Sequence, residues 1–237
     1  MIDREKIQEK EYEFPYHHLP VNDEQNWHLG KWWFNGLEYL GVLTYVKNII
    51  NDLNPKNVLD FGCGDGRLTL EMKKTGVPKI TGLDISEQAL NYAKIFNQSS
   101  NENVNLVSDF HEIEDMKFDL IVAMEVLEHI ENVYLFLENV KKLLIPEGIL
   151  LMTTPNLLSV SRFVKKSRWV GIAEKDHKYL FDKLSLSMIL TRSGFNHVKM
   201  RSYYFPSLNA SFDKLNNLLG YFPGGGMLLA EAKNMLT

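Results

Sequence analysis

The chain has 237 residues, 45% of them hydrophobic, with 26 Lys and Arg against 30 Asp and Glu. A chain of this length buries roughly 70–75% of its unfolded surface, so it needs no disulfide or structural metal to fold. The single Cys63 has no partner within the chain, and no apolar run is long enough to span a membrane. We therefore expect a cytoplasmic protein without a membrane partner, and the net charge of −4 argues against binding to bulk nucleic acid.

The N-terminal part of the sequence predicts an addition to the main fold. Residues 1–25 are polar and aromatic and predict an irregular arm. Over 27–53, apolar residues recur at helical spacing, and Gly36 and Gly41 favour two helices over one. The predicted organisation is an N-terminal arm and helical cap over 1–53, followed by one domain over 54–237.

From residue 57 onward, short apolar runs alternate with segments of helical length. Five runs predict strands, over 58–61, 80–84, 104–107, 120–123 and 148–153. The segments between them predict helices, over 68–74, after the N-cap residue Ser86, and over 133–144. Strands joined by helical connections form right-handed crossovers, so we expect a parallel sheet covered on both faces.

The C-terminal third departs from this alternation. We expect a helix over 182–193, two further strands over 198–205 and 226–232, and a surface helix within 206–223. Residues 157–176 predict an irregular stretch that carries basic side chains, namely Arg162, Lys165, Lys166 and Arg168. Both irregular insertions are expected to lie over one end of the sheet and to shape a pocket.

A glycine-rich loop follows the first strand and contains Gly62, Gly64 and Gly66. Glycine lets the backbone turn sharply and approach a ligand closely, and the N–H groups at the helix start can meet polar groups. Asp84 ends the second strand, where a carboxylate can accept both hydroxyls of a ribose. Asp109 follows the third strand beside Phe110, a pair suited to an adenine, although Phe110 equally suits core packing.

The same loop distinguishes between two nucleoside cofactors. A dinucleotide site requires a third glycine where this chain has Arg67. Asp60 and Asp65 also place carboxylates where a pyrophosphate would lie, which is unfavourable for a diphosphate and favourable for a ligand with an ammonium and a sulfonium. The loop therefore favours S-adenosylmethionine.

Five segments in this order resemble the class I S-adenosylmethionine-dependent methyltransferases, in particular the small-molecule O-methyltransferases with an E-x-x-E-H segment. They are VLDFGCGDG (58–66), ITGLDIS (80–86), LVSDF (106–110), FDLIVAMEVLEHI (118–130) and PEGILLMTTPN (146–156). The resemblance implies a Rossmann-like, doubly wound α/β sheet of seven strands, mostly parallel with the last strand antiparallel. It also implies a set of cofactor-binding residues: Asp60, Gly62, Cys63, Gly64, Asp84, Ile85, Asp109, Phe110 and Met124.

A second group of residues carries acid–base or metal-binding chemistry. Glu125, Glu128 and His129 have the spacing i, i+3, i+4, so a helical turn that started at Glu125 would place them on one face. His177 comes from the segment after the fifth strand and is expected to converge on them. Two carboxylates and imidazole suit a divalent cation such as Mg²⁺, which would lower the pKa of an acceptor hydroxyl.

One alternative to this metal site stays open. E-V-L-E-H also occurs in this fold without a metal, and Glu125, His129 or His177 would then be the catalytic groups, with a histidine as general base. The predicted function is O-methylation of a small metabolite or a sugar-containing acceptor. The basic segment suggests an anionic or phosphorylated acceptor, and a solvated surface segment explains these residues equally well. The alternatives are a metal-dependent RNA 2′-O-methyltransferase and a cofactor-binding protein without catalysis.

Overall fold

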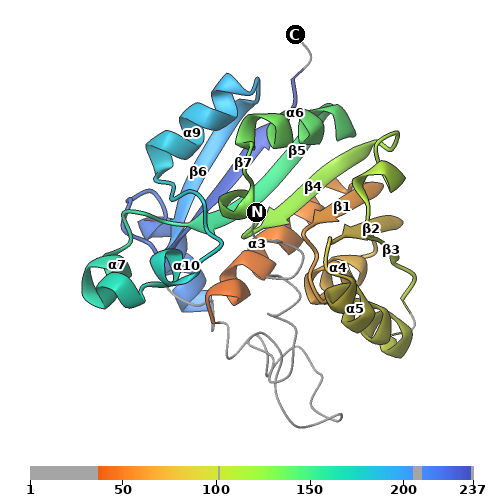
Figure 1. The fold of residues 1–237 in the computed structure, drawn as a ribbon, viewed down its shortest axis with the longest axis horizontal. Coiled ribbons are helices and arrows are strands. Elements are labelled where there is room, and N and C mark those ends of the chain that lie inside the picture. Colours follow the sequence, from red (N-terminus) through yellow and green to blue (C-terminus); the bar gives the residue numbers. More distant parts are fainter. Residues whose placement is uncertain (1–36, 101, 205–209, 236–237) are drawn as a thin grey trace.

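The computed structural model describes residues 37–100, 102–204 and 210–235. They build one seven-stranded sheet in the order β3-β2-β1-β4-β5-β7-β6 (Figure 1). The strands are β1 (Asn57–Phe61), β2 (Lys79–Leu83), β3 (Asn105–Val107), β4 (Phe118–Met124), β5 (Leu144–Pro155), β6 (Asn196–Tyr203) and β7 (Met227–Lys233). The first five strands pair in parallel, and β7 pairs antiparallel with both β5 and β6. This is the Rossmann-like α/β sheet that the sequence predicts.

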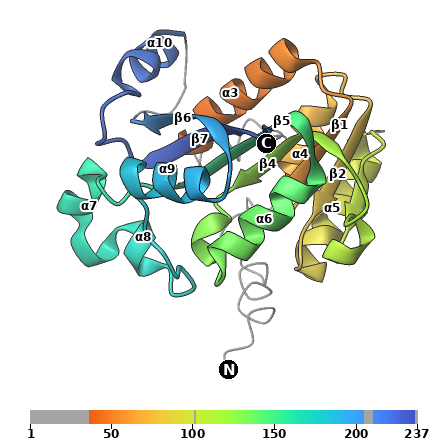
Figure 2. The ribbon, with the colours of Figure 1, turned by 90° about the horizontal axis from the view of Figure 1, so that it is seen from above.

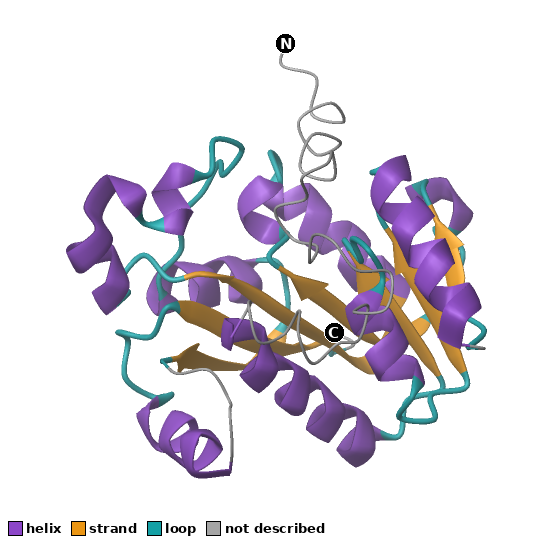
Figure 3. Ribbon diagram, turned by 90° about the horizontal axis from the view of Figure 1, so that it is seen from below, coloured by secondary structure: helices purple, strands orange, loops and turns teal. Residues whose placement is uncertain are grey.

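Helices cover both faces of the sheet (Figures 2 and 3). They are α3 (Leu37–Leu53), α4 (Arg67–Lys73), α5 (Glu87–Ser100), α6 (Val133–Leu143), α7 (Val160–Lys165), α8 (Val170–Ala173), α9 (Lys183–Arg192) and α10 (Ala210–Leu219). The buried side chains of α3 and α4 share one core cluster, and those of α6 and α9 share the other, on the opposite face. None of the described helices is both long and apolar enough to cross a membrane.

The central strands supply both clusters because successive side chains point to opposite faces of a sheet. In β4, Leu120 and Val122 pack on the α3 side, whereas Ile121 and Ala123 pack on the α6 side. All four are fully buried. A strand buried on both faces has an uninterrupted apolar sequence, which is why this strand is visible without tertiary information.

The N-terminal helix differs from the prediction. Helix α3 runs without a break through Gly41, so the expected interruption there is wrong, while the part before Leu37 lies outside the described residues. A glycine inside a helix costs about 1 kcal/mol, and burial of Val42 and Val46 against the sheet more than offsets it.

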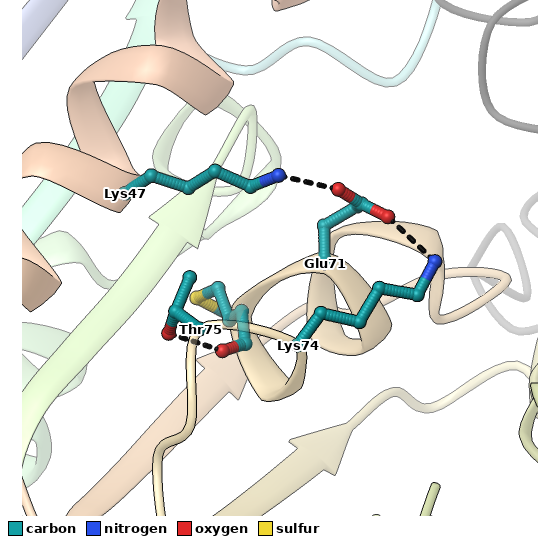
Figure 4. Close-up of polar contacts among 5 residues, drawn as sticks. Lys47, Glu71, Lys74 and Thr75 are labelled. Atoms are coloured by element: carbon teal, nitrogen blue, oxygen red, sulfur yellow. Dashed lines mark hydrogen bonds and ion pairs between the residues drawn. The ribbon is translucent and has the colours of Figure 1, made fainter. Parts of the chain in front are cut away.

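A charged contact also joins α3 to α4. Lys47 donates to Glu71 at 2.5 Å, and Lys74 of the same turn donates to the other oxygen at 2.8 Å (Figure 4). Helix α3 thus packs against α4 and the sheet, and the domain boundary at residue 53 stays a prediction.

Two segments after β4 are more regular than expected. Strand β5 starts at Leu144 and therefore includes Pro146. The pairing of β5 with β4 has a register shift between Phe118 and Leu120 of β4, and a strand tolerates a proline beside such an irregularity. The stretch predicted as irregular, 157–176, contains α7, a 3-10 turn and α8. Trp169, which is 1% exposed, anchors it to the protein.

Candidate active site

The glycine loop between β1 and α4 is shaped by left-handed backbone conformations. Gly62, Gly64 and Gly66 have φ angles of 73°, 53° and 75°. A Cβ at Gly62 would lie 2.6 Å from the Val126 side chain, and one at Gly66 would lie 2.8 Å from Ala93. The loop therefore needs glycine for its conformation and for its close packing against neighbouring segments.

Asp84 ties this loop to the end of β2. Its carboxylate accepts a hydrogen bond from the Gly64 N–H at 2.8 Å and from the Ser86 N–H at 2.9 Å. Ser86 in turn caps α5 by accepting from the Ala89 N–H, as predicted. Ile85 is 52% exposed beside Asp84, so an acceptor carboxylate and an apolar side chain lie together at the sheet edge. This pair suits the ribose and the base of a nucleoside.

Asp60 is buried behind the loop. Its carboxylate accepts from the Thr69 hydroxyl of α4 at 2.6 Å and is 2% exposed. Burial raises the pKa of Asp60 to about 7, with further increases from the charges of Asp84 and Asp65, while the Thr69 bond acts in the opposite direction. Asp65 itself forms a buried ion pair with Arg67. The predicted contact of Asp60 with the cofactor stays a prediction.

Cys63 fills the space between the loop and β2. Its thiol is buried and lies 3.8 Å from the Gly64 carbonyl oxygen, and a Cβ at Gly82 would be 2.9 Å from the sulfur. Burial raises the pKa of the thiol well above its usual value, so the side chain packs as a neutral group.

The third strand contributes Asp109 and Phe110. Asp109 accepts from the His111 N–H at 2.9 Å and so caps the 3-10 turn Phe110–Glu112, and Glu112 bonds back to the Asp109 N–H. Phe110 is half-buried against the core cluster on the α6 side, and Met124 is half-buried at the end of β4. The structure thus gives Asp109 a capping role and Phe110 a packing role, and contacts with an adenine remain predictions.

The segment after β4 does not form the expected helical turn. Glu125 has a φ of 54°, and its N–H donates to the Thr153 backbone oxygen at 3.2 Å. The turn that follows is a 3-10 turn over Leu127–His129. The prediction of one helical face with Glu125, Glu128 and His129 is therefore wrong, because the left-handed residue starts a new direction of the chain.

Three of the four predicted metal ligands nevertheless converge. The ligand atoms of Glu128, His129 and His177 lie within 4.8 Å of one another, and Glu125 is outside this group. The two imidazole rings are 4.8 Å apart between centroids. His177 is held by a bond from Nδ1 to the Gly171 carbonyl oxygen at 3.2 Å.

Asp176 completes the cluster, and sequence reasoning missed it. Its carboxylate lies 2.6 Å from Nδ1 of His129. Burial by itself would raise the pKa of Asp176, but the bond from His129 and the charge of that ring hold it below its usual value. Because Nδ1 faces Asp176, Nε2 of His129 is the nitrogen available for chemistry. In the sequence, Asp176 directly precedes His177, and this adjacency is the feature that could have identified Asp176 as a member of the cluster.

Glu128 is a buried carboxyl group within the cluster. Its side chain is fully buried. Within the described residues neither of its carboxylate oxygens makes a hydrogen bond of good geometry, and the nearby Thr154 hydroxyl does not make one to it either. Burial, followed by the charge of Glu125, raises the pKa of Glu128 well above its usual range. A carboxyl group in this position needs either a proton or a cation, and two imidazoles beside it form a donor set that fits a divalent cation.

Comparisons with known proteins identify the family of the chain. The profile of the family described as "Methyltransferase domain" matches residues 42–200. A ubiquinone biosynthesis O-methyltransferase from Rickettsia bellii is 32% identical over 138 residues, which cover 57% of this chain and 55% of that protein. One from Glaesserella parasuis is 38% identical over 122 residues, 48% of this chain and 51% of that protein. The chain thus spans about half the length of these relatives.

Solved structures share the fold at low sequence identity. The plantazolicin methyltransferase BpumL, in complex with SAH, has a TM-score of 0.63 and 17% identity, over 98% of this chain and 96% of that one. The methyltransferase domain of bacterial CtHen1 has a TM-score of 0.60 and 19% identity, over 83% of this chain and 99% of that one. With the seven-stranded sheet, the glycine loop and the profile match over most of its length, the chain belongs to the methyltransferase domain family.

Proposed function

We propose that the protein transfers the methyl group of S-adenosylmethionine to a hydroxyl oxygen of a small molecule. The observation that carries this proposal is the pairing of Asp84 with the glycine loop, which puts a carboxylate and close-packed backbone at one sheet edge. The names of the O-methyltransferases that match about half of this chain support an oxygen acceptor.

Methyl transfer from a sulfonium is a displacement at carbon. The acceptor oxygen forms a bond to the methyl carbon, the carbon–sulfur bond breaks, S-adenosylhomocysteine leaves, and the hydroxyl proton goes to a base. Alignment of the three reacting atoms supplies much of the acceleration, so the chain must hold the acceptor beside the cofactor. His129 ends the 3-10 turn after β4, and His177 bonds to the Gly171 carbonyl oxygen of α8, so the two rings suit this position.

We further propose that Glu128, His129 and His177 hold a divalent cation. The support is the buried carboxyl group of Glu128, which has no well-formed hydrogen bond within the described residues, together with two imidazoles within 4.8 Å. When bound, a divalent cation lowers the pKa of a hydroxyl that coordinates it. Asp176 fixes the ring of His129 through Nδ1.

Cofactor binding is tested by calorimetry with S-adenosylmethionine and the variant Asp84→Ala. Loss of a charged hydrogen-bond acceptor costs about 1.5–3 kcal/mol, so we expect an affinity at least tenfold lower. Asp115→Ala, which removes an exposed carboxylate, is the matched control and should bind like the parent. Equal binding by the parent and Asp84→Ala, or preference of the parent for a nicotinamide dinucleotide, would refute the assignment.

The cation is tested separately from catalysis. Metal content is measured by mass spectrometry after incubation with Mg²⁺, Mn²⁺ or Zn²⁺ and removal of the excess, for the parent and for Glu128→Gln. We expect one ion per chain in the parent and none in the variant, with Glu87→Gln on the exposed start of α5 as control. A parent that retains no ion, yet still transfers methyl groups, would favour His129 as a metal-free general base.

The acceptor is sought with labelled cofactor and a panel of phenols, catechols, sugars and sugar phosphates. A short RNA with a free 3′ end belongs to the same panel, which tests the RNA alternative in one assay. Transfer to a phenol or sugar supports the proposal. Transfer to RNA alone would replace the small molecule as acceptor, and transfer to no compound would leave a cofactor-binding protein.

A further inference from the structure

Helix α7 turns its apolar side chains toward solvent. Val160, Phe163 and Val164 have the spacing i, i+3, i+4 and therefore form one stripe. They are 59%, 65% and 77% exposed. A surface helix normally directs such a stripe to the core, so an outward stripe indicates a contact with something outside the described chain.

Positive charge surrounds this stripe. The segment 157–173 contains Arg162, Lys165, Lys166 and Arg168 and no acidic residue, in a chain whose net charge is −4. The Arg162 guanidinium lies 5.6 Å from the centre of the Phe163 ring. We name Val160–Arg168 the α7 surface; it combines exposed apolar side chains with four cations.

The α7 surface is held in place by the protein. Trp169 is buried directly after it, and Ser159 caps the helix by accepting from the Ser161 N–H. The Val160 N–H donates to the Gly224 carbonyl oxygen at 3.0 Å, which attaches α7 to the turn after α10. That turn exposes Tyr221 and Phe222, so further aromatic side chains lie close in the chain to this attachment point.

We propose that the α7 surface docks the protein onto a lipid bilayer that contains anionic headgroups. Phe163 and the two valines would enter the boundary between headgroups and acyl chains, and the exposed Lys165, Lys166 and Arg168 would meet the headgroup phosphates. Arg162 is half-buried and donates to the Leu157 carbonyl oxygen at 2.8 Å, so it contributes its charge rather than a free side chain. Aromatic rings also stack on nucleic acid bases, but Val160 and Val164 gain nothing there, so the aliphatic part of the stripe favours lipid over RNA.

The docking surface is connected to the candidate active site. Gly171, which follows the α7 surface and the buried Trp169, accepts the hydrogen bond from His177. A bilayer held against α7 would therefore lie near the cluster of Glu128, His129 and His177. This part of the inference rests on the proposed function: the acceptor would be an amphipathic hydroxyl compound taken from the bilayer. The expectation of no membrane partner rested on the lack of a segment long enough to span a bilayer, and it does not apply to a helix that lies on the bilayer surface.

The test is co-sedimentation of the full chain with vesicles of phosphatidylcholine, alone or mixed with phosphatidylglycerol. We expect binding to the mixed vesicles that weakens as salt is added, and little binding to the neutral ones. Replacing both lysines, Lys165→Gln and Lys166→Gln, should lower the affinity about fivefold per residue. Val164→Ser should lower it about tenfold.

Matched controls change the same residue types elsewhere. Lys56→Gln with Lys79→Gln alters two exposed lysines at the amino ends of β1 and β2, and Ile95→Ser alters an exposed aliphatic residue on α5. Both should bind vesicles like the parent, and every variant should keep the parent's affinity for S-adenosylmethionine, which reports a correct fold.

Three results would overturn the inference: no binding to mixed vesicles, equal binding to neutral and mixed vesicles, or unchanged binding by the α7 variants. Salt-sensitive binding of a short RNA that the α7 variants lose, without vesicle binding by the parent, would identify the α7 surface as a nucleic-acid surface and also overturn it. Failure of the proposed function has a different outcome, because a protein that binds mixed vesicles but no S-adenosylmethionine contradicts the function and leaves the docking surface intact.

Discussion

Asp60→Asn tests whether burial controls the charge behind the glycine loop. The pKa of Asp60 rises from 3.8 to about 7 on folding, chiefly because the carboxylate is buried. A carboxyl group with a raised pKa stabilises the folded protein fully below pH 3.8, and this contribution disappears as the pH rises through 7. A shift of about three units corresponds to about 4 kcal/mol, at about 1.4 kcal/mol per unit. Asparagine is neutral at every pH and can keep the bond from Thr69.

The assay is urea unfolding of the parent and of Asp60→Asn between pH 5 and 8. The stability of the parent relative to the variant should fall by about 1.4 kcal/mol per unit from pH 5 to 7 and become constant above that range. Other titrating groups are common to both proteins and cancel in the difference. Asp115→Asn, at an exposed position, should follow the parent in parallel. Parallel curves for the parent and Asp60→Asn would mean that Asp60 is solvated or charged throughout, and would refute the reasoning.

Three further changes probe the site and its support. Gly62→Ala should lower the free energy of unfolding by about 2–4 kcal/mol, because φ is 73° and the new Cβ would meet Val126 at 2.6 Å. Thermal unfolding measures this change, and a loss below about 0.5 kcal/mol, which is typical of surface substitutions, would contradict it. Asp176→Asn should lower kcat about 10–100-fold without changing the KM for S-adenosylmethionine, since it disturbs only the orientation of His129; steady-state kinetics decide, and an equal rise in KM would point to the cofactor site instead. Trp169→Ala should cost about 3–5 kcal/mol, because the ring is almost fully buried; a neutral effect in urea unfolding would show that the segment is not anchored there.

The sequence alone determined the sheet, the glycine loop and the family. Strands such as β4 are buried on both faces and therefore appear as uninterrupted apolar runs, and the parallel order follows from their helical connections. The position of Asp84 was equally predictable, because a residue at the carboxyl end of a parallel strand must lie at the same sheet edge as the loop after the neighbouring strand. These features depend on residues close together in the chain.

The tertiary structure decided which of these residues share a site and which are buried. It leaves Glu125 outside the group of ligand atoms formed by Glu128, His129 and His177, because the left-handed backbone at Glu125 ends the helical spacing on which the prediction relied. It brings Asp176 to His129 and turns the apolar stripe of α7 outward, and both depend on how the segment after β5 packs against distant parts of the chain. Local spacing fixes the direction of a side chain within its element, but burial and charge arise from contacts between elements, and no pattern in one segment contains them.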